Sequence, residues 1–218
     1  MGQGRLVLSL IEAGFEAFLE RRADLAARVI ADDDVVDRVD VTIERAAVQI
    51  LEDATASHAK LGASTLRAVL TIVKVNNELE RIADLAVSVA ERASAMDQVA
   101  GDIPPTFRVL ANSVAGILRD VCSSFDRSDA ALARVVLQSE EAVLAFKSLV
   151  LRDAESRIAA GTMSVDFAFA LHEVASACER MADHSTNIAE QVIYAATGTI
   201  VRHAQGQWVD VAPHPDAG

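Results

Sequence analysis

Two rows of carboxylates are the groups in this sequence whose spacing could support chemistry. The first row has residues spaced four, three and four apart: Asp33, Asp37, Asp40 and Glu44. The second row has two acids four residues apart, Glu80 and Asp84, with Asn77, Ser88 and Glu91 close to the same line. In a helix such residues share a face, where like charges repel by about 0.2–0.5 kcal/mol per pair. A bound cation would remove this repulsion, and carboxylate oxygens suit magnesium, calcium, manganese or iron. The alternative is an ordinary charged outer face of a helical bundle.

The second half of the chain repeats only the second row. Glu179 and Asp183 reproduce the Glu80 and Asp84 pair 99 positions later, and Asn187 and Glu190 continue the line. A second echo, between residues 26–30 and 132–136, has an offset of 106 and places Ser139, Val143, Phe146 and Val150 where the first half has its acidic row. A metal site in the second half is therefore predicted to be weaker. His184, beside this line, is taken as an ordinary polar residue.

Catalytic signatures are absent from the sequence. None of the five histidines follows a Glu by three residues, as di-iron helical bundles require, and there is no Gly-rich phosphate loop, GxSxG or HExxH. Cys122 and Cys178 belong to no Cys or His cluster, which predicts two buried thiols. The pattern indicates a binding protein rather than an enzyme.

Capping residues and chain breaks predict the helices that carry the carboxylates. Helices are expected over 5–22, 24–59, 63–96, 105–125, 128–160 and 164–197, with Asp24, Ser128 and Ser164 as N-caps and a break at 101–105. The predicted fold is all-α, a tandem repeat of two three-helix bundles over 1–100 and 104–200, followed by a tail over 201–218 whose proline-containing end is expected to be mobile.

Apolar residues spaced three and four apart mark the buried face of three helices. These seams are Val36, Val39, Ile43, Ala46 and Ile50; Ile72, Val75, Leu79, Ile82, Ala86, Val89 and Ala93; and Leu171, Val174, Cys178, Met181, Ser185, Ile188 and Val192. The carboxylate rows lie roughly opposite the seams and are expected to face outward. The trio Val143, Phe146 and Val150 is expected either to form an exposed dimer contact or to be buried in its own bundle.

Charge narrows the classes of partner. The net charge of -12 argues against nucleic acid and favours cations or basic protein surfaces. The sequence has no signal-peptide core and no run of about 20 apolar residues. A cytoplasmic location is therefore predicted.

The duplicated motif resembles the signature of the PhoU family, accessory proteins of the bacterial phosphate-specific transport (Pst) system. That family carries Glu/Asp-x-x-x-Asp on the third helix of each of two three-helix bundles, which residues 80–84 and 179–183 match. The continuation over 187–190 and the stretch 194–203 are also similar to family sequences, so the resemblance covers nearly the whole chain.

The resemblance implies a regulator of phosphate homeostasis that restrains the phosphate-starvation response. Such a protein would be an adaptor between the ATP-binding subunit of the Pst transporter and a phosphate-sensing histidine kinase, a homodimer, and peripheral to the membrane only through its partners. It also implies iron, zinc or another divalent metal cluster on the motif carboxylates. Taken together, the expected metal ligands are Asp33, Asp37, Asp40, Glu80, Asp84, Glu179, Asp183 and Asn187. The alternative function is a helical metal-binding or storage protein with no role in signalling.

Three features depart from the family pattern. The first helix begins later than is usual, which predicts one shortened helix in the first bundle. Ser88 stands where Asn is frequent, and the second bundle lacks acids at Ser139 and Val143. The last two departures, at Ser88 and at Ser139 and Val143, weaken the prediction of metal binding, chiefly for the second bundle.

Overall fold

The computed structural model describes residues 2–96, 101–204 and 207–211. The elements are α1 (Gly2–Leu19), α2 (Ala23–Ala56), α3 (Ala63–Ala95), α4 (Pro105–Arg127), α5 (Ala130–Ala159), α6 (Val165–Thr197), β1 (Ile200–Ala204) and β2 (Gln207–Val211). The prediction of six helices is confirmed, and their ends lie within about three residues of those expected.

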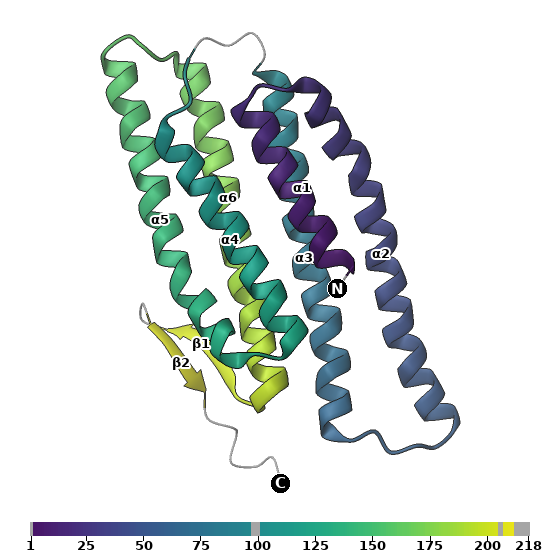
Figure 1. The fold of residues 1–218 in the computed structure, drawn as a ribbon. Helices are drawn as coiled ribbons and strands as arrows, with labels where there is room; N and C mark the ends of the chain where they lie inside the picture. Colours follow the sequence, from purple (N-terminus) through teal and green to yellow (C-terminus); the bar gives the residue numbers. More distant parts are fainter. Residues whose placement is uncertain (1, 97–100, 205–206, 212–218) are drawn as a thin grey trace.

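The helices form two three-helix bundles that share one hydrophobic core. Helices α1, α2 and α3 pack together, as do α4, α5 and α6, and α3 lies along α6 at the centre of the molecule (Figure 1). All seven seam residues of α6 are buried, including Cys178. Cys122 is only partly buried, and its burial raises the pKa of the thiol to about 11.

Helix α1 is much shorter than its two partners. It has 18 residues against 34 in α2 and 33 in α3, so the lower part of the α2–α3 pair projects as a two-helix arm without a third helix (Figure 1). The expected seam residues Ile50 and Ile72 lie on this arm and are 45% and 40% exposed. Ala46 is exposed as well, and Val39 and Ile43 are only partly buried. The prediction that these residues belong to the core was wrong, because no helix in the described part of the chain covers them. Within these ranges α1 is the shortest helix of its bundle, as predicted.

Local sequence explains where the helices of the second bundle begin. Pro105 starts α4, where its missing N–H costs nothing, and the Ser164 hydroxyl accepts a hydrogen bond from the backbone N–H of Phe167 at 3.1 Å, as predicted for an N-cap. Ser128 is not an N-cap: it ends α4 at φ 51°, and Asp129 caps α5 by accepting from Leu132 at 3.0 Å. Asp24 lies inside the first turn of α2 rather than before it.

An antiparallel hairpin follows α6, where the sequence predicted only a tail. Strand β1 pairs with β2, and Val201 is fully buried. The Trp208 indole N–H donates to the carbonyl of Leu137 at 3.0 Å, and Arg134 pairs with Asp210 at 2.9 Å. Strands β1 and β2 are therefore docked on the second bundle, while the proline-containing end lies outside the described residues. No helix in the described ranges has the length and apolar character needed to cross a membrane.

Candidate functional site

The two carboxylate rows of the first bundle meet across the α2–α3 contact and form one acidic cluster. The Asn76 side-chain amide on α3 donates to the Asp40 carboxylate at 2.7 Å and to its backbone carbonyl at 3.1 Å. This bond sets the register, so that residues 33–40 of α2 face residues 76–84 of α3. We call Asp33, Asp37, Asp40, Glu80 and Asp84 the acidic cluster. The sequence located both rows but not their convergence.

Partial burial and crowding make ionisation less favourable for three members of the cluster, Asp33, Asp40 and Glu80. Burial raises the pKa of Asp33 to about 6, and the charges of Asp37 and Asp84 act in the same direction. Burial likewise raises the pKa of Asp40, with Glu44 and Asp37 adding to it, and the pKa of Glu80, with Asp84 adding to it. Carboxylates from both helices therefore share one electrostatic environment.

The cluster receives little compensation from the cations of the protein. Among the described ion pairs, the one that reaches it joins Arg81 Nε to Glu80 Oε2 at 3.7 Å, a long contact at an exposed arginine. One oxygen of Asp33, Oδ1, is buried without a hydrogen-bond partner. A buried carboxylate oxygen without a partner is costly, which leaves the cluster ready to accept a cation or a donor group.

In the second bundle, a lysine of the same bundle offsets the charge of the motif glutamate. Lys147 on α5 forms a close ion pair with Glu179 on α6, and both side chains are partly buried. With the offset of 106, Lys147 stands where the first half has Val41. Asp183 is exposed nearby on α6. The glutamate of the second motif thus has a lysine partner, at a position where the first half has a valine.

Two other residues of the α6 line are engaged elsewhere. The Asn187 amide donates to Glu78 Oε2 at 3.2 Å, and His184 Nδ1 lies 2.7 Å from the same oxygen. Glu190, expected on the outer face, is only 8% exposed and pairs with Arg202 of β1; burial raises its pKa, although Arg202 opposes this. The sequence analysis missed Glu78. Its position two residues before Glu80, about 200° around the helix, was the available signal that it faces α6 rather than α2.

The structure also decides the position of the apolar trio on α5. Val143 and Val150 are fully buried, and Phe146 is partly buried against the core. An exposed dimer contact at these residues is therefore excluded, and they belong to the interior of their own bundle.

Comparison with known proteins identifies the fold and the repeat. A family model described as the PhoU domain matches residues 2–93 and again residues 107–192. The chain belongs to the PhoU family. It is 27% identical over 195 residues to phosphate-specific transport system accessory protein PhoU homolog 1 of Thermotoga maritima, covering 88% of this chain and 82% of that protein. It is 29% identical over 206 residues to the PhoU homolog of Pseudomonas putida, covering 93% and 78%.

A solved PhoU structure has the same architecture. The crystal structure of PhoU from Pseudomonas aeruginosa superposes with a TM-score of 0.82 at 28% identity and covers 91% of this chain and 93% of its own. Each motif therefore lies on the third helix of a PhoU repeat, with α3 and α6 in the centre.

The first PhoU repeat has ligand atoms of the type that a hard cation prefers, but these atoms are not arranged as a coordination site. The acidic cluster supplies carboxylate oxygens, among them the unpartnered Asp33 Oδ1. Within the described residues, no three His, Cys, Asp or Glu side chains already form a set that could hold a metal ion. Binding would thus require side-chain movement, for which the exposed Asp37 and Asp84 are free on the surface. The second repeat suits a cation less, because Lys147 already pairs with Glu179.

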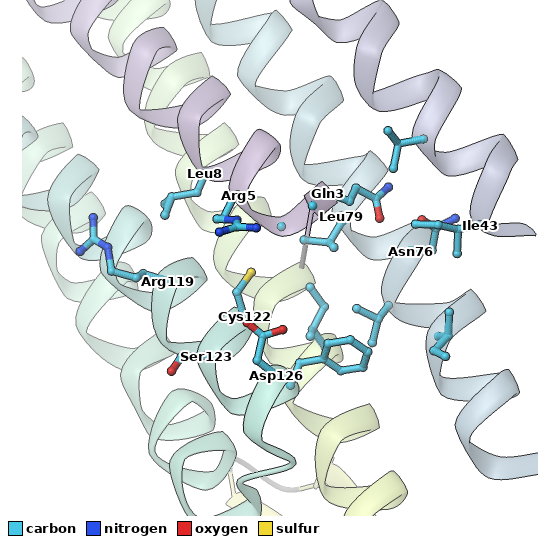
Figure 2. A pocket seen from close by; sticks show the side chains of 17 residues that line it. Gln3, Arg5, Leu8, Ile43, Asn76, Leu79, Arg119, Cys122, Ser123 and Asp126 are labelled. Atoms are coloured by element: carbon cyan, nitrogen blue, oxygen red, sulfur yellow. The ribbon is translucent and has the colours of Figure 1, made fainter. Parts of the chain in front are cut away.

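A separate apolar hollow lies beside the first turn of α1 (Figure 2). Val39, Ile43 and Ile72 line it, which accounts for the partial exposure of these expected core residues. Two buried polar atoms at its edge, Gln3 Nε2 and Asn76 Oδ1, have no hydrogen-bond partner. None of the five residues of the acidic cluster lines it, so the hollow and the cluster are distinct features of this PhoU repeat.

Proposed function

We propose that this protein regulates phosphate homeostasis as a negative regulator of the phosphate-starvation response. In this proposal it is a cytoplasmic, homodimeric adaptor between the ATP-binding subunit of the Pst transporter and the phosphate-sensing histidine kinase, and it approaches the membrane only through these partners. The support is family membership together with relatives whose names describe accessory proteins of the phosphate-specific transport system.

One observation carries the mechanism: among the described ion pairs, only the long contact between Arg81 and Glu80 offsets the charge of the acidic cluster. Its carboxylates lie on two helices, α2 and α3, that pack against each other. The helix packing fixes the positions of the carboxylates before any partner protein binds. Burial and, after it, mutual repulsion raise the pKa of Asp33 and Glu80, and lysine or arginine side chains of a partner would offset both effects. We therefore assign partner docking to the first repeat.

A divalent metal is compatible with the same surface. Asp33, Asp37, Asp40, Glu80 and Asp84 would hold iron, zinc or a similar ion in the first repeat, with Glu179, Asp183 and Asn187 as a weaker set in the second. When bound, the metal would supply positive charge that offsets the carboxylates and that can accept ligands from a partner. Docking without metal would use the carboxylates directly.

The double substitution Glu80→Ala with Asp84→Ala tests this function. We expect its affinity for the ATP-binding subunit to fall at least tenfold, measured by surface plasmon resonance, because the cluster loses two of its five carboxylates. Melting temperature should hold or rise, because the pKa of Glu80 is raised in the fold. Glu155→Ala with Asp166→Ala, two exposed acids of the second bundle, makes the same change in net charge and serves as control. Unchanged affinity, or a large loss of melting temperature, would contradict the proposal.

The unpartnered oxygen of Asp33 among neighbouring carboxylates supports one alternative, a metal-binding or storage protein without a signalling role. Elemental analysis of the purified protein separates the two functions. Stoichiometric metal that disappears in the double variant, with no binding to transporter or kinase, would support storage. Partner binding, with or without metal, would support the adaptor.

A further inference from the structure

The two-helix arm of the first bundle carries an apolar patch that nothing in the described structure covers. Within the arm, the buried residues are Ala47, Val69 and Thr71. The patch consists of five aliphatic residues: Val41 at 42% exposure, Val48 at 53%, Leu51 at 39%, Leu66 at 42% and Leu70 at 56%. Scattered exposed aliphatic residues are normal, but five of them on the same side of two packed helices indicate a contact surface.

The apolar patch lies on the same face as the acidic cluster. On α2, Val41 follows Asp37 by four residues, and Val48 follows Val41 by seven. On α3, Leu66 and Leu70 precede Asp84 by eighteen and fourteen residues. At 3.6 residues per turn these steps return to the same side of the helix within about 40°. The two helices, whose register is fixed by the Asn76–Asp40 hydrogen bond, therefore present one surface, acidic near the middle of the α2–α3 pair and largely apolar toward the tip of the arm.

The internal repeat places the apolar pair at an equivalent position in both bundles. Leu66 and Leu70 correspond, 99 positions later, to Val165 and Phe169, which are 53% and 66% exposed. Leu70 and Phe169 both precede the glutamate of their motif by ten residues. The exposed pair is thus a feature of the repeat, while the uncompensated carboxylates occur in the first copy alone among the described motifs.

We propose that this composite surface binds an amphipathic helix of a partner protein whose basic residues are concentrated toward one end and whose aliphatic residues are concentrated toward the other. The basic end lies over the acidic cluster and the aliphatic end over the apolar patch. The inference rests on the proposed function only for the identity of the partner, and it specifies the form of the segment that docks.

Charge and length define the occupant. Residues 32–44 contain six carboxylates and one arginine, which favours a cationic segment over a second copy of the same acidic surface. From Asp33 to Leu51 on α2, and from Asp84 back to Leu66 on α3, the surface spans eighteen residues. At 1.5 Å per residue this is about 27 Å, so a partner helix of about 18 residues fits. Apolar side chains of such a helix would lie against Val48 and Leu70.

A synthetic peptide tests the surface without any transport protein. The probe is an 18-residue fluorescent helical peptide with lysines in one half and leucines at helical spacing in the other. The comparison peptide has the same composition with lysines and leucines distributed evenly. We expect the segregated peptide to bind at least tenfold more tightly in fluorescence anisotropy, because only it can satisfy both ends of the surface at once.

Matched variants assign the binding to this face. Leu66→Ser with Leu70→Ser should weaken the segregated peptide at least tenfold, whereas the equivalent Val165→Ser with Phe169→Ser should change it less than twofold. All four side chains are exposed, so neither variant should unfold the protein. Equal binding of the two peptides, or equal losses in the two variants, would overturn the proposal. Failure of the protein to bind the ATP-binding subunit would count against the proposed function but would leave the peptide result standing.

Discussion

At the scale of single residues, the negative charge of the acidic cluster makes the folded protein less stable at neutral pH. Asp33 shows this most directly, because its pKa is about 6 in the fold against an ordinary value of 3.8. Between these pH values the folded protein holds a proton that the unfolded chain has released. Stability therefore falls as pH rises from about 4 to about 6, and the loss persists at pH 7. The cluster sacrifices stability at neutral pH, as functional sites frequently do.

Asp33→Asn should stabilise the protein at pH 7. The amide removes a repelled charge, and after allowance for solvent screening at this partly exposed site we expect a gain of about 1 kcal/mol or less. At pH 4, where Asp33 is largely protonated in the fold, the gain should shrink. Urea unfolding at both pH values measures the difference. The neighbouring exposed Asp32→Asn is the control, and an equal effect of both substitutions would show that burial of Asp33 is not the cause.

At the scale of helices and strands, the periodicity of the sequence predicted the elements better than their contacts. The α6 seam is buried as predicted because α3, α4 and α5 surround it. The α2 seam residues after Val36 are exposed or only partly buried. Periodicity indicates which face of a helix is apolar, but it does not indicate whether another helix packs against that face. Both acidic rows could be found from spacing alone. Their convergence depends on the register of α2 against α3, which a single sequence does not state.

Residues far apart in the sequence account for the other missed features. Lys147 and Glu179 lie 32 positions apart, and a lone lysine among aliphatic residues of α5 gave no sign of its partner. The hairpin was missed because its strands are only five residues each and one contains alternating polar residues. Docking by Trp208 and Val201, rather than strand propensity, accounts for its stability.

Arg202 should hold the hairpin to α6. Its ion pair with the buried Glu190 satisfies a carboxylate that is only 8% exposed, so Arg202→Met leaves that group without its cation. We expect a loss of about 1 kcal/mol and a red shift of fluorescence from Trp208, the single tryptophan. Arg180→Met, an exposed arginine on the same helix, is the control. An unchanged emission spectrum in Arg202→Met would show that the hairpin is held by other contacts.

At the scale of the whole molecule, the two PhoU repeats share a fold but have diverged in charge distribution. By sequence, residues 1–100 and 101–218 carry the same net charge, 11 basic against 17 acidic residues and 9 against 15. What differs is the local arrangement of charge: in the first repeat five carboxylates gather with one long contact to Arg81, whereas in the second Lys147 forms a close ion pair with Glu179. One repeat thus presents a local negative field, although the net charges are equal.

That local field should govern how fast a basic partner associates. Asp37→Asn with Asp84→Asn removes two exposed charges from the acidic cluster, and Glu155→Gln with Asp166→Gln removes two from the second bundle, so both variants have a net charge of -10 (from -12). Electrostatic steering depends on charge near the docking surface. We therefore expect the cluster variant to bind the ATP-binding subunit several-fold more slowly at low salt, and the other variant to bind at nearly the wild-type rate.

Salt separates this local effect from a general one. At about 0.5 M NaCl, where screening acts over only a few ångströms, the association rates of the wild type and both variants should converge. Stopped-flow fluorescence across a salt series measures this. If both variants slow association equally at low salt, the total charge of the protein steers the partner and the first repeat has no special part in the encounter. If only the cluster variant does so, divergence of the two repeats has given this PhoU protein one docking side, with the arm and its acidic cluster as the face that partners meet first.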